Sequence, residues 1–175
     1  SHTITAKAGS TSVVDTKLVL DGAATDLILD ASDAALRLDA VEGGSLATIT
    51  ASGDNAVTIS AVPDAALTVV AGSMTAAVNF TGGTAAETIT TGTGNDVINS
   101  GAGKATITTG TGTDDVIVLE ANGAAANAVT IKDFAEGGSG DDLDISYALI
   151  DGAGSAINLA GTAGSTDVAA GNFGS

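Results

Sequence analysis

The amino-acid sequence predicts an all-β fold, a parallel β-solenoid in which short strands stack as successive coils. Three observations lead to this prediction. Short apolar segments of β-type residues return every nine or ten residues through much of the chain, and alternation within them is typical of strands. Glycine, asparagine, aspartate and alanine fill the breaks between these segments. Hydrophobic residues make up 44% of the chain but aromatic residues only 2%, so the core is expected to be narrow and aliphatic.

The first part of the chain, 1–81, is expected to form irregular solenoid coils. Three apolar triplets are spaced by nine residues and further ones follow at about ten: Leu18-Val19-Leu20, Leu27-Ile28-Leu29, Leu36-Arg37-Leu38, Thr48-Ile49-Thr50, Val57-Thr58-Ile59, Leu67-Thr68-Val69 and Ala77-Val78-Asn79-Phe80. If two such units make one coil, Asp21 and Asp39 lie on the same side of neighbouring coils. Two adjacent carboxylates repel each other unless water or a cation separates them.

The segment 82–118 is a stricter repeat of four consecutive nonapeptides that begin at residues 82, 91, 100 and 109. Each copy has glycine at its second position and isoleucine or valine at its eighth, and the acidic sixth position reads Glu87, Asp96, Ala105 and Asp114. Copies two apart are expected to stack on the same face of the solenoid, with Ile98, Ile107 and Val116 in the core. Strands this short need such stacking to be stable.

The last part of the chain, 119–175, is expected to cap the solenoid. Two strand-like stretches, 129–134 and 141–146, flank an acidic glycine-rich turn. An open solenoid end exposes core side chains and unpaired backbone groups, so a C-terminal cap of short strands is expected here. The three parts together are expected to form one continuous domain.

Composition restricts the functions that the chain can have. Five Lys and Arg residues stand against 21 Asp and Glu residues, a net charge of −16, which argues against nucleic acid as a partner. Cysteine is absent, so thiolate metal sites are excluded. No stretch is long enough and apolar enough to insert into a membrane. The single histidine is His2, and neither H-E-x-x-H nor G-x-S-x-G occurs, so catalysis is not expected.

The glycine-rich turns predict a cation site. Glycine allows turns in which backbone carbonyls converge, by adopting positive φ, and aspartate adds a carboxylate at the same point. The second and fourth nonapeptides supply two such half-shells on one side of the solenoid. Facing oxygen ligands of this kind suit Ca²⁺. The predicted ligands are Gly92, Gly94, Asp96, Gly110, Gly112, Asp114 and Asp115. On the opposite side Ala105 replaces the acid and Lys104 would compete with a cation, so one site is expected.

The nonapeptides at 82–117 resemble the RTX repeat, glycine-glycine-x-glycine-x-aspartate-x-aliphatic-x, and 129–146 resembles the strand-turn-strand that often follows such repeats. The resemblance implies a right-handed RTX-type β-roll with Ca²⁺ between its coils, exported by type I secretion and folded outside the cell. The upstream alanine- and threonine-rich coils resemble those of surface-layer and adhesin proteins of Gram-negative bacteria. The implied function is a calcium-binding structural module at the cell surface. Self-assembly or a surface polysaccharide would then be the partner.

Two alternatives remain. The chain could be the C-terminal secretion and folding module of an exported protease or lipase. It could also bind a ligand on a flat face, because Thr88-Ile89-Thr90 and Thr106-Ile107-Thr108 would stack as a threonine ladder of the kind that ice-binding solenoids use. The sequence indicates only two such rows, and threonine favours strands for its own reasons, so the structural role is preferred.

Overall fold

A computed structural model of the protein describes residues 2–5, 12–15, 17–43, 45–112, 115–119, 129–135 and 140–145. Every regular element in these ranges is a β-strand. The strands are β1 (His2–Thr5), β2 (Ser12–Asp15), β3 (Leu18–Val19), β4 (Asp26–Asp30), β5 (Ala35–Leu38), β6 (Val41–Glu42), β7 (Thr48–Ser52), β8 (Val57–Ile59), β9 (Leu67–Val70), β10 (Val78–Thr81), β11 (Glu87–Thr90), β12 (Val97–Asn99), β13 (Ala105–Thr108), β14 (Val116–Leu119), β15 (Thr130–Ile131) and β16 (Asp142–Ile145).

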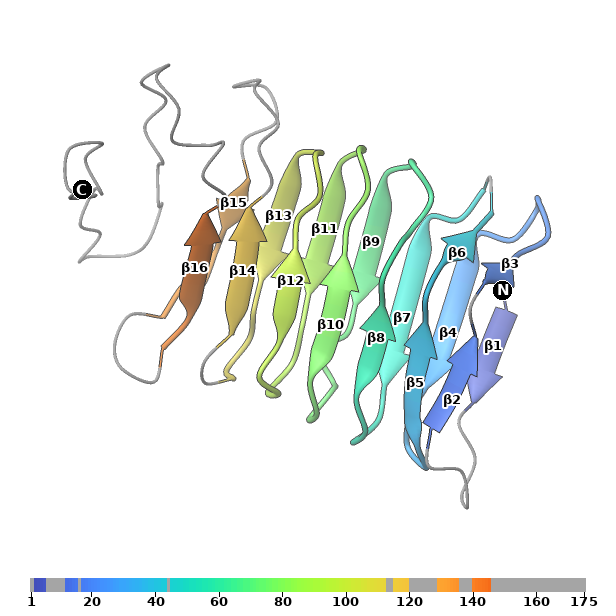
Figure 1. Ribbon diagram of the computed structural model, residues 1–175, viewed down its shortest axis with the longest axis horizontal. Helices are drawn as coiled ribbons and strands as arrows, with labels where there is room; N and C mark the ends of the chain where they lie inside the picture. Colours follow the sequence, from blue (N-terminus) through green and yellow to red (C-terminus); the bar gives the residue numbers. More distant parts are fainter. Residues whose placement is uncertain are drawn as a thin grey trace.

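Two long parallel sheets form the solenoid. The first sheet has the strand order β1-β4-β7-β9-β11-β13-β15, and the second has the order β16-β14-β12-β10-β8-β5-β2. From β7 onward, successive strands of the chain alternate between the two sheets, so each coil contributes one strand to each (Figure 1). All pairings are parallel. The predicted all-β parallel solenoid is therefore confirmed.

The core lies between the two sheets and follows the alternation of the strands. In the first sheet one inward column is built of aliphatic residues in direct register: Ile49, Val69, Ile89, Ile107 and Ile131. The second sheet faces it with a column that includes Ile59, Phe80 and Ile98. Phe80 is only 2% exposed, so the expectation of a core without aromatic residues is wrong. The coil from Ile59 to Phe80 is longer than a strict pair of nonapeptides.

The coils before residue 81 have a third side. Leu18 lies in β3, Leu27 in β4 and Leu36 in β5, so triplets nine residues apart occupy three different sides of the solenoid. The third side is the two-stranded sheet β3-β6. The prediction that Asp21 and Asp39 stack is wrong, because Asp21 follows β3 whereas Asp39 follows β5.

The coils of 82–118 have two sides, as the nonapeptide predicts. Thr88 pairs with Thr106 in the first sheet, and this step equals two nonapeptides, so two nonapeptides make one coil. The next step in the second sheet is one residue longer, because Ile98 pairs with Ile117. Ile117 is fully buried and takes the core place that was assigned to Val116. The fourth copy is therefore one residue out of phase with the other three.

The strands expected to cap the solenoid form one more parallel coil at its end. β15 extends the first sheet from β13, and β16 extends the second sheet from β14. They are the last described strands at this end of the molecule, on the far side from β1 (Figure 1). The rest of the predicted cap, 120–128, 136–139 and 146–175, lies outside the described residues.

Candidate functional site

The predicted glycine turns stack directly on one another at the corner where the chain passes from the first sheet to the second. A Cβ atom on Gly110 would overlap the carbonyl oxygen of Gly92, and one on Gly112 would overlap that of Gly94. Gly92 stands in the same relation to Met74 of the preceding coil. The structure thus brings the two predicted half-shells together, one coil apart.

The reason for glycine at these corners is close backbone approach more than unusual torsion angles. Of the four predicted glycines only Gly110 has a positive φ, +89°, so the expectation of positive φ throughout is wrong. Amides of one coil donate to carbonyls of the coil before: Thr93 N to Met74 O at 3.0 Å and Thr111 N to Gly92 O at 3.1 Å. A side chain would separate the coils and break these hydrogen bonds.

Asp96 and Asp115 lie one above the other at this corner. The longer step in the second sheet places Asp96 beside Asp115 in register, directly before the paired Val97 and Val116. Asp114, the ligand predicted from the nonapeptide, lies outside the described residues. Asp96 is 0% exposed and Asp115 is 1% exposed, so both carboxyl groups are inside the coil.

Each of the two carboxyl groups reaches back to the preceding coil with one oxygen. Asp96 Oδ1 accepts a hydrogen bond from Val78 N at 2.7 Å, and Asp115 Oδ1 accepts one from Asp96 N at 2.6 Å. The other oxygens, Asp96 Oδ2 and Asp115 Oδ2, are buried and have no hydrogen-bond partner. A buried polar atom without a partner lowers stability by about 1–3 kcal/mol, and by more when it is charged. A ligand bound to these two oxygens would remove that cost.

The electrostatics of this corner disfavour free carboxylates. The pKa of Asp115 is raised to about 6, mainly by burial; the nearby carboxyl groups of Asp96, Asp141 and Asp133 contribute to this rise, and a hydrogen bond from the amide of Asp96 opposes it. Burial is also the largest cause of the raised pKa values of Asp96 and Asp141. A bound cation would favour the ionised forms and reverse these shifts.

The sequence reasoning missed two acids that extend the same corner by one coil. Asp133 accepts hydrogen bonds from Thr109 N at 2.9 Å and Gly110 N at 2.8 Å. Asp141 accepts one from Ala135 N at 2.8 Å and one from Thr109 Oγ1 at 3.4 Å. Asp133 comes soon after β15 just as Thr109 follows β13. Aligning strand ends instead of nonapeptide copies would have found it.

Glu87 is a further buried acid, at the opposite corner. It is 2% exposed, and its Oε1 accepts a hydrogen bond from Gly83 N at 3.0 Å while its Oε2 has no partner. Burial, and to a smaller degree the carboxylate of Asp64, raises its pKa against an opposing hydrogen bond from Gly83. Lys104, expected to compete with a cation here, is exposed. This corner, set aside on sequence grounds, is a second candidate cation site.

These corners hold pairs of acids, which are too few to supply all the ligands of a metal ion. Within the described ranges, no three His, Asp or Glu side chains converge as a metal-binding group. Any cation held between Asp96 and Asp115 would take its remaining ligands from backbone carbonyls of the stacked turns. Carboxylate and carbonyl oxygens together are the ligand set that Ca²⁺ accepts.

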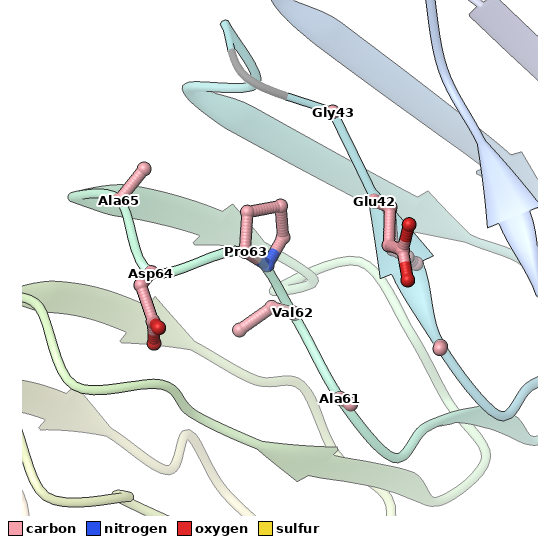
Figure 2. Close-up of a pocket in the computed structure, with 9 residues that line it drawn as sticks. Glu42, Gly43, Ala61, Val62, Pro63, Asp64 and Ala65 are labelled. Carbon is pink, nitrogen blue, oxygen red and sulfur yellow. The ribbon is translucent and has the colours of Figure 1, made fainter.

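An open groove lies on the third side of the earlier coils, between β6 and the segment 61–65 (Figure 2). Glu42 and Asp64 supply its only charged side chains. Glu42 forms an ion pair with Lys17 at 2.9 Å, and Asp64 accepts hydrogen bonds from Thr84. Both acids already have partners, so the groove adds no reactive group to the candidate site.

No protein-family model, no curated protein and no solved structure matches this chain. In the part of the chain that the structure describes, there is no helix of the length and hydropathy needed to cross a membrane. The resemblance to RTX repeats is therefore based on the amino-acid sequence of the nonapeptides.

Proposed function

We propose that this chain is a calcium-binding structural β-roll module, and that calcium binds at the corner formed by Asp96 and Asp115. One observation above all supports the proposal: two stacked, fully buried carboxyl groups each keep one oxygen without a hydrogen-bond partner. A cation between coils would satisfy both oxygens and neutralise both charges at once.

The chemistry of the corner favours calcium over other metals. The available ligands are carboxylate and carbonyl oxygens, with neither cysteine nor histidine among the described residues at the corner. Oxygen ligands suit hard cations, and of these Ca²⁺ tolerates flexible geometry whereas Mg²⁺ demands a near-ideal octahedron and retains water. A corner made of stacked backbone turns cannot readily rearrange around the smaller ion.

We further propose that the module belongs to a secreted bacterial cell-surface protein of the surface-layer or adhesin type, which folds when it meets calcium outside the cell. This part of the proposal is supported by the RTX-like nonapeptides at 82–117 and by the acidic net charge of −16. Low calcium before export would leave Asp96 and Asp115 without a ligand, and high calcium after export would stabilise the stacked coils.

The test is calcium titration of the chain by calorimetry, together with thermal melting in calcium and in chelator. A ligand that binds only the folded state stabilises it by about 2.7 kcal/mol at 100 times its dissociation constant. Asp115→Asn should weaken calcium binding and reduce the calcium-dependent rise in melting temperature. Asp142→Asn is the matched control, because Asp142 is exposed and its substitution removes the same charge a short distance away. If the two variants bind calcium equally well, the site is not at this corner.

A further inference from the structure

The outward face of the first sheet carries a two-column array of threonine. One column is in direct register across five strands, and the other lies beside it on four of these strands, two residues further along each. The first column is Thr48, Thr68, Thr88, Thr106 and Thr130, and the second is Thr50, Val70, Thr90 and Thr108. We call the part on β7, β9, β11 and β13 the threonine face. The two rows visible in the sequence are therefore part of a longer array.

The array is not a by-product of the nonapeptide repeat. The step from Thr88 to Thr106 equals two nonapeptides, but the other steps along the first column are longer, and the last of them, to Thr130, is the longest. Coils of different length thus return the same side chain to the same place. The strand preference of threonine does not explain it either, since the matching outward column of the second sheet is mixed: Arg37, Thr58, Asn79 and Val97.

The threonine face is regular and uncharged. Neighbouring strands repeat at about 4.8 Å, and outward positions along one strand repeat at about 6.7 Å, so the hydroxyl and methyl groups form a two-dimensional lattice. The buried column from Ile49 to Ile107 supports it from behind. No Asp, Glu, Lys or Arg stands in the two columns on these strands; nearby charged residues are Asp26 beside Thr48, the exposed Lys104 two residues before Thr106, and Lys132 beyond β13. In a chain of net charge −16, a neutral face of this extent is a distinct surface.

We propose that the threonine face binds the surface of crystalline ice. Ice is itself an uncharged lattice that repeats in two dimensions, with oxygen spacings close to the strand repeat, so hydroxyls and methyls held in register can match many sites at once. Each threonine hydroxyl both donates and accepts a hydrogen bond, as lattice water requires. Because the whole array is held by the sheets, it loses little conformational freedom on binding.

Other occupants fit the face less well. The outward side chains of β7, β9, β11 and β13 include no aromatic ring to cover a sugar face. A stable interface with a second copy needs an apolar centre, whereas Val70 is the only large apolar side chain in the two columns between Thr48 and Thr108. A neutral lattice of water is the occupant that hydroxyls at fixed spacing favour.

The test is adsorption of the chain, in calcium, to a growing ice surface, together with the thermal hysteresis of its solution. The wild-type chain should adsorb and shape ice crystals. Thr88→Tyr, at an exposed position in the centre of the face, should lose most of the hysteresis, as should Thr68→Tyr on the next strand. Val97→Tyr is the matched control, because Val97 is also exposed and outward but lies on the second sheet. Circular dichroism and melting temperature check that each variant is folded.

Three outcomes would overturn the inference. The first is a folded wild-type chain that leaves ice growth unchanged. The second is equal hysteresis in Thr88→Tyr and Val97→Tyr. The third is a threonine-face substitution that leaves ice adsorption intact but abolishes dimerisation in sedimentation or retention on insoluble cellulose, which would assign the face to a second copy or to a polysaccharide. None of these readouts depends on where calcium binds.

Discussion

The coils before residue 81 and the coils of 82–118 build the corners between their strands in different ways. The earlier coils are longer than two nonapeptides and fill their corners with buried apolar side chains such as Leu20, Leu46 and Met74. The later coils shorten to two nonapeptides in the first sheet and one residue more in the second, and they turn on glycines that pack against the backbone of the coil before. Every buried charged side chain among the described residues lies between Glu87 and Asp141.

This difference divides the molecule into a part stabilised by apolar burial and a part whose corners hold carboxyl groups without full hydrogen bonding. Apolar burial needs no ligand and stabilises in proportion to the area removed from water. Buried acids such as Asp96 and Asp115 are costly until they are protonated or bound to a cation. We therefore expect the earlier coils to be stable in any buffer, and the later coils to depend on calcium and on pH.

The largest effect is expected in the apolar part. Leu27 is 0% exposed, and Leu27→Ala should lower the free energy of unfolding by about 2–5 kcal/mol, through lost transfer energy and the cavity left behind. The cost should be the same in calcium and in chelator. Chemical denaturation in both buffers measures it, with Val19→Ala, at a 64% exposed position, as a control expected to change stability by less than about 0.5 kcal/mol. A cost for Leu27→Ala that depends on calcium would contradict the division.

An intermediate effect is expected at the glycine corners. A Cβ on Gly103 would overlap the carbonyl oxygen of Ala85, whereas a Cβ on Gly22 would meet no atom within 4 Å. Gly103→Ala should therefore cost about 1–3 kcal/mol, as overpacking does. Gly22→Ala should be nearly neutral. Equal melting temperatures for the two variants would show that the later coils can separate at their corners without loss.

The smallest effect is a pH dependence that changes sign with calcium. The native pKa of Asp115, about 6, lies above its ordinary value of 3.8, so the folded state binds more protons between these limits. Without calcium, stability should fall as pH rises from about 4 to 6. With calcium, which binds the ionised carboxylate, stability should rise over the same window. Melting temperature against pH in both buffers measures this, and Asp115→Asn should reduce both slopes.

A pH profile that is the same with and without calcium would contradict the proposed cation site. The raised pKa values of Asp96 and Asp141 act in the same direction as that of Asp115. Residual slope in the Asp115→Asn variant is therefore expected.

Much of the fold could be predicted from periodicity alone. Inward and outward alternation in segments such as Thr88-Ile89-Thr90, returning at regular intervals, is sufficient to predict stacked parallel strands. The prediction of two nonapeptides per coil is confirmed where the repeat is strict. It fails upstream, where equal spacing of Leu18, Leu27 and Leu36 could mean either two sides or three. Spacing along the chain does not specify the angle of a corner.

The candidate site was predictable in its place but only partly in its residues. Glycine and aspartate in the turn of 91–96 indicated the correct corner, because glycine permits the tight turn and aspartate supplies a carboxylate there. The partner of Asp96 was assigned by counting nonapeptides, and the extra residue before β14 placed Asp115 there in register. Asp133 and Asp141 belong to a coil of irregular length. Counting nonapeptides therefore cannot align these two residues with the acids of the preceding coil.

Sequence by itself determined the class of structure, because strand periodicity and turn chemistry are local properties of the chain. It also determined that any metal at the corners must be one that accepts oxygen ligands, because cysteine is absent. Only the tertiary structure decided which residues become neighbours across coils: Asp115 above Asp96, and Thr48 through Thr130 in one line. The register between coils depends on the total number of residues in the corners. It is fixed only when backbone hydrogen bonds form between the stacked strands.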